Sequence, residues 1–267
     1  MKLLLQRMWE LGISWDECFP NDIKATFVEW INEIEIINQL KIPRLYFNEI
    51  NWESIELHLF SDASPKSYGS VGYFLLKRTD KYFTSFIMSK SRLAPLKKLT
   101  LPRLELLCAL ISARLEHYLQ NTFPMLKKEN IYYCSDSQIC IYWIKGKADD
   151  WKPFVRNRVS EIKEKTNLKR WHHCIGKSNP SDKLTRGMNA KSLVKDEIWI
   201  KGPSWLLEPN IPYNLSDPID SDLDSIKEEK RKVAVSLLTK VEHLQSLLNL
   251  HSYTNLNKVI RITFYIS

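Results

Sequence analysis

The sequence lacks the cysteine pairs and the long apolar runs that mark several common classes of protein. Its 267 residues contain five cysteines, an odd number, and no two of them form a Cys-x-x-Cys pair. Neither a disulfide framework nor a zinc site is indicated, and we expect buried, reduced thiols in an intracellular protein, cytoplasmic or nuclear. The first apolar run is broken at Gln6 and Arg7, too early for a signal peptide. No stretch approaches the roughly 18 apolar residues of a membrane-spanning helix.

Motifs of two enzyme classes are also missing. The chain has no Tyr-x-Asp-Asp polymerase motif and no Asp-Thr-Gly or Asp-Ser-Gly motif of an aspartic peptidase, whose glycine permits a tight active-site turn. The nearest matches to the peptidase motif are Asp62-Ala63-Ser64 and Asp136-Ser137-Gln138. Polymerase activity is therefore excluded on motif grounds, and peptidase activity from these residues is improbable.

The composition indicates a globular protein with a polyanionic partner. Hydrophobic residues make up 44% of the chain, which is enough for one large core or for one core with a small appendage. The formal net charge is +8. Because lysine and arginine drive association with phosphates through counterion release, nucleic acid is favoured over the alternative of a merely basic soluble protein.

Hydrophobic patterning in the first half predicts helices, then a strand meander, then a long helix. Apolar residues at helical spacing before residue 50 indicate a helical lead-in. Three strands with breaks at Gly69 and at residues 77–81 are then expected: Ile55–Phe60, Ser70–Leu76 and Tyr82–Met88. Thr100 can cap a following helix with Pro102 in its first turn, and the apolar series continues to Tyr118.

The second half predicts a βααβα succession. The expected elements are a strand at Ile131–Cys134, helices at Gln138–Ile144 and Trp151–Lys165, a strand at Leu168–Ile175 and a helix at Asn179–Met188. Trp143 is expected in the core and Trp151 in a mixed role, partly core and partly stacking on nucleic acid. Asp150 is interpreted as a helix cap rather than as half of a polymerase metal pair with Asp149.

Four acidic residues stand, in chain order, at the end of a predicted strand, on the following helix, at the end of another strand and on a late helix. They are Asp62, Glu105, Asp136 and Asp182. Any one of them could be a turn former that bonds nearby backbone. Clustered carboxylates, however, repel and raise one another's pKa unless cations lie between them. Since Mg²⁺ prefers hard oxygen ligands, the set predicts a site for two-metal phosphodiester chemistry.

Six runs carry a specific likeness to a known family: Ser61–Ser64, Ser89–Leu106, Ser135–Ser137, Trp151–Val159, Asn179–Asp182 and Trp199–Leu206. Together they closely resemble the ribonuclease H-like region of BEL/Pao LTR retrotransposon pol polyproteins, which is also labelled a Pao retrotransposon peptidase region. The resemblance implies an α/β fold with a five-stranded mixed sheet flanked by helices, and with helical extensions at both ends.

The resemblance also implies an activity and its cofactor. Asp62, Glu105, Asp136 and Asp182 would hold two Mg²⁺ ions, which Mn²⁺ could replace, and the substrate would be the RNA strand of an RNA/DNA hybrid. RNA would be distinguished from DNA by its 2′-hydroxyls in the shallow minor groove. Cellular enzymes of this fold often carry a mobile histidine before the last aspartate. Here His173 is expected in a structural position at a strand end, with Lys177 or Ser178 nearer to the place of a proton shuttle.

The implied organisation is that of a segment of a larger polyprotein. Residues 1–50 resemble a helical connector after a reverse transcriptase, 51–207 the ribonuclease H-like domain, and 226–267 a helical segment that leads toward an integrase. Residues 208–225 read as an acidic linker. The expected partners are therefore an RNA/DNA hybrid and the reverse transcriptase and integrase portions, with no membrane.

Basic residues flank the acidic ones and predict a nucleic-acid interface. Those expected to contact phosphates are Arg92, Lys97, Lys98, Lys152, Arg156 and Arg158. A solvated loop is the equally weighted alternative for the run before Glu105.

Two other functions are alternatives to hybrid cleavage. The first is a retroelement fragment that grips nucleic acid but cuts weakly or not at all, because the flanking domains are missing from this chain. The survival of all four acids argues against decay of the site. The second is integrase catalysis, which is disfavoured because Glu161 and Glu164 follow Asp136 too closely to supply its final glutamate.

Overall fold

The computed structural model describes residues 1–42, 45–46, 52–79, 81–208 and 224–231, all within the unit Met1–Arg231. Most of the expected acidic linker (208–225) and C-terminal helical segment (226–267) lies outside the described residues. The described part of that region is a short helix, α9 (Asp224–Glu229). The proposed domain boundaries at residues 50 and 207 stay predictions.

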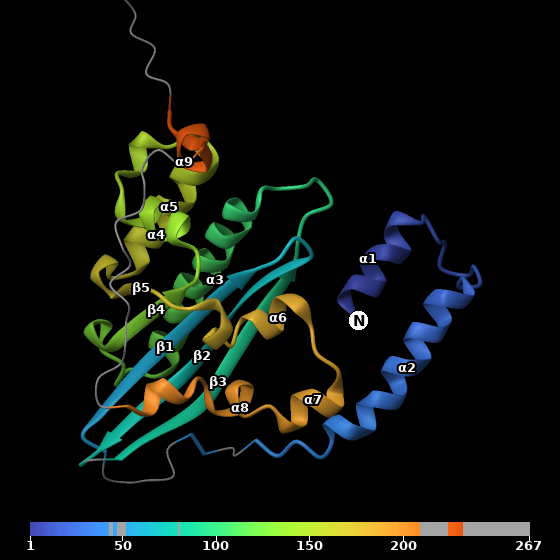
Figure 1. The fold of residues 1–267 in the computed structure, drawn as a ribbon, viewed down its shortest axis with the longest axis horizontal. Coiled ribbons are helices and arrows are strands. Elements are labelled where there is room, and N and C mark those ends of the chain that lie inside the picture. Colours follow the sequence, from blue (N-terminus) through green and yellow to red (C-terminus); the bar gives the residue numbers. More distant parts are fainter. Residues whose placement is uncertain (43–44, 47–51, 80, 209–223, 232–267) are drawn as a thin grey trace, which may run out of the picture. The chain divides into compact units, whose positions relative to one another are not determined.

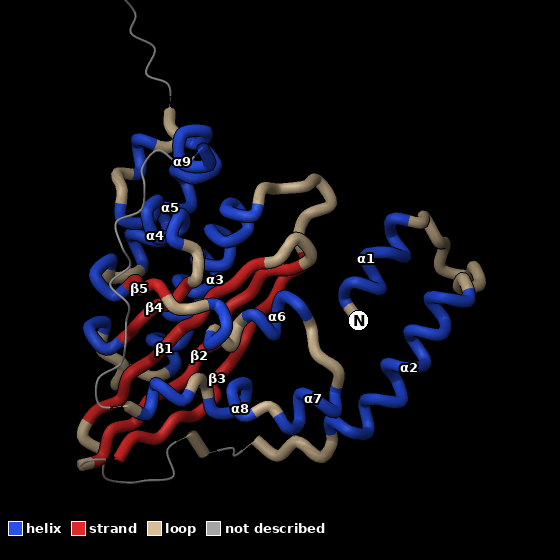
Figure 2. The backbone as a smooth tube through the Cα atoms, in the orientation of Figure 1, coloured by secondary structure: helices blue, strands red, loops and turns tan. Residues whose placement is uncertain are grey.

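The centre of the fold is the five-stranded mixed sheet that the resemblance implies (Figures 1 and 2). Its strands are β1 (Ser54–Ala63), β2 (Ser67–Arg78), β3 (Lys81–Leu93), β4 (Ile131–Ser135) and β5 (Trp171–His173). The order across the sheet is β3-β2-β1-β4-β5. β1, β2 and β3 pair antiparallel, as the predicted meander requires, whereas β4 pairs parallel to both β1 and β5.

The sequence predicts a break between strands at Gly69, and this prediction is wrong. Gly69 is an interior residue of β2. A Cβ at this position would lie 2.8 Å from the carbonyl oxygen of Lys90 and 3.1 Å from Cα of Ser91, both on β3. The two backbones therefore approach each other too closely here for any side chain. Glycine in a strand marks such a close approach as often as it marks an end, and the sequence does not separate the two cases.

The predicted helices are present, with shifted ends. The helices that follow the meander are α3 (Leu101–Thr122), α4 (Gln138–Lys145), α5 (Pro153–Lys165), α6 (Asp182–Arg186), α7 (Ala190–Lys195) and α8 (Glu197–Lys201). Thr100 is the N-cap residue of α3 in an extended conformation, but its side chain makes no cap hydrogen bond to a described residue. Asp150 does not cap α5, because that position belongs to Lys152 and Asp150 ends a 3₁₀ turn.

Helices cover both faces of the sheet (Figure 1). On one face α3, α4 and α5 bury a large apolar core that includes Leu57, Phe74 and the fully buried Trp143. On the other face a smaller cluster forms around Phe60 and Tyr73 and includes residues that follow α6. Burial of apolar side chains in these two clusters is the main stabilising contribution to the fold.

Trp151 belongs to the large core, contrary to the mixed role expected from the sequence. Its side chain is 2% exposed, and its ring lies against those of Trp143 and Tyr142. Stacking on nucleic acid is therefore closed to it. Ile226 of α9 is also fully buried in this core, so a residue beyond the expected linker completes it.

The N-terminal extension is helical, as expected, with α1 at Lys2–Glu10 and α2 at Asn21–Ile37. The amino group of Lys2 donates to the carbonyl oxygen of Ser91 at 2.9 Å, which connects α1 to the end of β3. In the described part of the chain, no helix combines the length and the apolar character needed to cross a bilayer. Four of the five cysteines are buried thiols as predicted, and Cys18 is exposed.

Candidate functional site

The four acidic residues singled out in the sequence line one cavity of about 570 Å³. Three of them lie in β1, α3 and α6, and Asp136 directly follows β4; Asp62 and Asp182 are 120 positions apart in the chain. The structure therefore brings together the whole predicted set. The rest of the lining is Ala63, Ser64, Pro65, Lys66, Leu101, Gly176, Thr185 and Arg186.

Strand pairing explains why two of the aspartates meet. β1 and β4 run parallel with Ser61 opposite Ser135, so the next residues, Asp62 near the end of β1 and Asp136 just after β4, lie at the same edge of the sheet. Glu105 lies in the first turns of α3, which packs across β1 and β2. Asp182 is the first residue of α6, which contacts the same two strands. The edge of a sheet at the carboxyl ends of its parallel strands is a common place for a site in α/β folds.

Asp62 is buried, with 7% of its surface exposed, and its Oδ2 accepts a hydrogen bond from the hydroxyl of Thr185. The pKa of Asp62 is raised to about 6, chiefly by burial and also by the negative charges of Asp136 and Asp182, against the lowering effect of the Thr185 hydrogen bond. The charged form of this carboxylate is thus held at a cost that a nearby cation would relieve.

Asp136 is in a similar state. Burial raises its pKa to about 6, and the charges of Glu105 and Asp182 act in the same direction. Its Oδ1 is buried and has no hydrogen-bond partner among the described residues. A Cβ on Gly176 would come within 3.1 Å of its Oδ2, so only glycine fits at that position without displacement.

Glu105 and Asp182 complete the cluster. The pKa of Glu105 is raised by burial and by the charge of Asp62, while a hydrogen bond from the Ser137 hydroxyl to its Oε2 lowers it. Ser137 also caps α4, since its oxygen accepts from the backbone N–H of Cys140 at 3.1 Å. Asp182 forms an ion pair with Arg186 one turn later in α6, with Nε 2.5 Å from Oδ1.

The donor set fits a hard divalent cation, although its side chains do not form a finished coordination shell. Within the described residues, no three acidic, imidazole or thiol groups are arranged so that they could hold a metal ion as they stand. Hydrogen bonds from Thr185, Ser137 and Arg186 engage oxygens of three of the carboxylates. The buried, unpartnered Oδ1 of Asp136 is the position where a cation would satisfy an otherwise costly group. Oxygen-only ligands are those that Mg²⁺ takes.

The histidine before the last aspartate lies at the end of β5, as expected. His173 Nε2 is 3.1 Å from the backbone carbonyl oxygen of Asp136. Lys177 lies in the 3₁₀ turn Gly176–Ser178, whose first residue lines the cavity. His173 thus fixes the segment that carries Asp136.

The predicted nucleic-acid contacts lie outside the cavity. Arg92, Lys97, Lys98 and Lys152 are exposed and Arg156 is partly exposed, while the cations that line the cavity are Lys66 and Arg186. Arg158 is partly buried instead: its guanidinium lies 3.6 Å from the ring centroid of Phe154 and donates to the carbonyl oxygen of that residue. Burial lowers the pKa of Arg158, and so do the charges of Arg114 and Arg103.

Sequence reasoning missed the polar residues that hold the carboxylates. Thr185 lies three positions after Asp182, and Ser137 directly follows Asp136. Ser137 belongs to the run Ser135–Ser137 and Thr185 to the expected helix Asn179–Met188. A serine or threonine close to an acid is nevertheless too common to be singled out. Helical spacing was the available signal for Thr185, since i and i+3 share a face.

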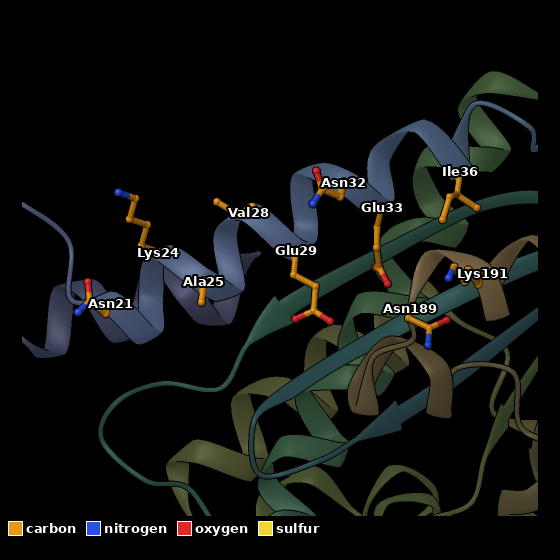
Figure 3. Close-up of a pocket in the computed structure, with 10 residues that line it drawn as sticks. All are labelled: Asn21, Lys24, Ala25, Val28, Glu29, Asn32, Glu33, Ile36, Asn189 and Lys191. Carbon is orange, nitrogen blue, oxygen red and sulfur yellow. The ribbon is translucent and has the colours of Figure 1, made fainter.

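A larger cavity of about 890 Å³ lies between α2 and α7 (Figure 3). Figure 3 shows Glu33 extending from α2 toward α7, where its carboxylate accepts a hydrogen bond from the backbone N–H of Ala190 at 3.2 Å. The lining of this cavity mixes two acidic, two basic and three amide side chains with apolar ones, and it has no cluster of like groups comparable to the four carboxylates. Size alone therefore does not make it the functional site, and the acidic cavity is the candidate.

Comparison with solved structures gives ribonucleases H. The N-terminal RNase H domain of Rv2228c from Mycobacterium tuberculosis is 12% identical, with 50% of this chain and 92% of that chain covered and a TM-score of 0.35. LC11-RNase H1, isolated from compost and solved in complex with an RNA/DNA hybrid, is 14% identical, with 52% and 99% covered and a TM-score of 0.34. RNase H1 from Halobacterium salinarum is 13% identical, with 53% and 98% covered and a TM-score of 0.29.

No curated protein matches the chain. One family model does, over residues 1–137, which is about half of the sequence and includes Asp62, Glu105 and Asp136. The chain belongs to the Pao retrotransposon-like RNaseH-like domain family.

Proposed function

We propose that this chain hydrolyses the RNA strand of RNA/DNA hybrids with the help of two Mg²⁺ ions, for which Mn²⁺ can substitute. The observation that carries the proposal is the convergence of Asp62, Glu105, Asp136 and Asp182 on one cavity of a ribonuclease H-like fold. The family supports the chemistry, and a structural neighbour was solved with an RNA/DNA hybrid bound.

The four carboxylates would hold the cations. Asp62 and Asp136 are the central candidates, because burial and repulsion from neighbouring acids raise the pKa of each to about 6, and Oδ1 of Asp136 has no hydrogen-bond partner among the described residues. When bound, the cations supply an activated water and neutralise the charge that develops on the leaving oxygen.

The chain's own cations would orient the substrate. Lys66 and Arg186 line the same cavity as the carboxylates, so a phosphate that enters it lies within reach of both. Arg92, Lys97 and Lys98 are exposed on the segment that leads to α3, where they would contact phosphates farther along the hybrid. RNA would be selected through its 2′-hydroxyls in the minor groove.

The partners follow from the family rather than from the fold. We infer that the domain acts beside the reverse transcriptase and integrase portions of a pol polyprotein, whose contacts would add to its grip on the substrate. An isolated chain would then need higher concentrations of hybrid than the whole polyprotein.

The experiment compares four labelled substrates with the purified protein: RNA/DNA hybrid, double-stranded DNA, double-stranded RNA and single-stranded RNA. We expect cleavage of the RNA strand of the hybrid with Mg²⁺ or Mn²⁺ and none after EDTA is added. Asp136→Asn should abolish cleavage, because it removes one charge of the cluster and keeps the shape. Asp149→Asn, at an exposed aspartate outside the cavity, is the matched control and should cut like the parent.

The outcomes separate the proposed function from its alternative. Hybrid that is bound but left intact at high protein concentration would support a nucleic-acid-binding fragment without catalysis. Equal cutting of all four substrates, or cutting that survives Asp136→Asn, would contradict the proposed site.

A further inference from the structure

Among the described residues, the side chain of Thr185 connects α6 directly to the Asp62 carboxylate by a hydrogen bond. Its side chain is 2% exposed, and its hydroxyl donates to Oδ2 of Asp62 across 123 positions of sequence. The hydroxyl oxygen of Thr185 also lies 3.0 Å from the carbonyl oxygen of Asp182, one turn earlier in α6. A hydroxyl has a single proton, and a hydrogen bond to the charged Asp62 carboxylate is stronger than one to a neutral carbonyl oxygen.

The backbone of Thr185 is held on its other side. Its carbonyl oxygen accepts hydrogen bonds from the hydroxyl of Ser64, in the turn after β1, and from that of Ser67, the first residue of β2, each at 2.9 Å. The segment before α6 is fixed to the same strand, since the amide of the buried Asn179 donates to the carbonyl oxygen of Ser61 at 3.0 Å. Thr185 is therefore held in place by backbone contacts that do not depend on its hydroxyl.

This separation matters for what the hydroxyl does. If its only task were to anchor α6, the bonds from Ser64, Ser67 and Asn179 would already supply that anchoring. The contact to Oδ2 adds something different, because it selects one rotamer of a carboxylate at the floor of the acidic cavity. Groups that hold a metal-binding carboxylate in this way commonly matter 10- to 100-fold in metal affinity or activity.

We propose that Thr185 is a positioning residue, whose hydroxyl fixes the Asp62 carboxylate in the orientation that binds the divalent cation and sets its distance from α6, which carries Asp182. The inference rests on the proposed function for its catalytic consequence. Its binding consequence can be measured without any turnover. Thr185 touches neither the substrate nor the reacting atoms in this account and acts only through Asp62.

The test uses three substitutions. Thr185→Val keeps the branched shape and removes the hydroxyl, whereas Thr185→Ser keeps the hydroxyl and removes a methyl group. Ser67→Ala removes a hydrogen bond to the backbone of Thr185 and leaves the contact to Asp62 intact; Ser67 does not line the cavity. Thermal unfolding of all three reports any loss of folding.

Calorimetric titration with Mn²⁺ is the first readout. We expect Thr185→Val to weaken Mn²⁺ binding about tenfold. Thr185→Ser and Ser67→Ala should stay within about threefold of the parent. With hybrid, Thr185→Val should lower kcat with little change in KM, since the substrate contacts are untouched.

Three results would overturn the inference: parental Mn²⁺ affinity in Thr185→Val, an equal loss in Thr185→Ser, or an equal loss in Ser67→Ala. The last would show that anchoring of α6, and not the hydroxyl at Asp62, is what counts. Failure of the proposed function looks different. If the parent binds Mn²⁺ but does not cut hybrid, the function is wrong while the affinity comparison still decides the role of Thr185. If the parent binds no Mn²⁺, both are wrong.

Discussion

Glu116 shows at the scale of one residue how burial sets the behaviour of an acid outside the candidate site. It lies on α3 with 1% of its surface exposed, and the hydroxyl of Tyr133 donates to its Oε2. Burial raises its pKa from 4.5 to about 7, although Tyr133, Lys128 and Lys165 act in the opposite direction. The folded protein therefore prefers the protonated form of Glu116 over most of the range from pH 4.5 to 7.

The sign of the resulting pH dependence follows from this raised pKa. Stability from Glu116 is fully present below its unfolded-state pKa and is lost as pH rises through about 7. At roughly 1.4 kcal/mol per pKa unit, the loss is about 3 kcal/mol. We predict that Glu116→Gln loses less stability than the parent between pH 5 and pH 8. Urea unfolding at several pH values measures the difference, in which the titration of other groups cancels; parallel curves for the two proteins would contradict it.

Gly69 gives a second prediction at this scale, because it pairs with Asp62 across β1 and β2. Gly69→Ala would place a Cβ 2.8 Å from the carbonyl oxygen of Lys90, a backbone atom that cannot rotate away. We expect a destabilisation of about 1 to 3 kcal/mol, the usual cost of overpacking. A thermal unfolding midpoint equal to that of the parent would show that β2 and β3 separate freely there.

The residues that carry charge were readable from the sequence, and those that orient them were not. Asp62, Glu105 and Asp136 are recognisable because they stand at the ends of two predicted strands and in the first turns of a predicted helix. Thr185 contributes through a bond across 123 positions, which no local pattern encodes. Trp151 was misread for a similar reason: its burial depends on α4 and α9.

At the scale of elements, α9 packs on the large core from beyond the expected linker. Ile226 is fully buried, and Glu229 forms an ion pair with Arg103 at 2.6 Å. The backbone of Lys230, just after α9, forms an isolated antiparallel β-bridge with that of Trp151. Arg103 lies two positions before Glu105, so α9 packs beside the start of the helix that presents a site residue. We therefore predict that residues beyond 207 contribute to the stability of the core.

Ile226→Ala tests whether α9 is part of the core. Removing a fully buried isoleucine side chain to Cβ costs about 2 to 5 kcal/mol. Ile175→Ala, at a residue that is 56% exposed, is the control and should cost much less. Denaturant unfolding of the two variants compares them directly. Equal and small losses would mean that α9 is not a stable part of the fold in solution.

Element existence was predictable because apolar periodicity reports which face is buried, whereas ends depend on tertiary contacts. β3 runs to Leu93, well past the predicted Met88, because it pairs with the whole of β2. The last strand is short, Trp171–His173, because the parallel partner β4 ends at Ser135 and the residues before Trp171 form a 3₁₀ turn.

At the scale of the whole molecule, the net charge of +8 should appear as salt-dependent binding. We predict that a Lys97→Ala, Lys98→Ala double variant weakens hybrid binding and lowers the slope of log affinity against log salt by about one to two units. The charge-matched control changes Lys191 and Lys195, which are exposed on α7 beside α2. Equal slopes for the two double variants would show that the segment before α3 does not touch phosphates.

The central claim is that four carboxylates from four elements form one site for divalent cations. The most direct test is a crystal structure of the Asp136→Asn variant bound to hybrid. The crystals are grown with Mn²⁺, and anomalous data are collected at the manganese edge. The account predicts two manganese peaks among Asp62, Glu105, position 136 and Asp182, next to a phosphate of the RNA strand. Saturating Mn²⁺ with no peak at these carboxylates, or peaks only elsewhere on the protein, would contradict it.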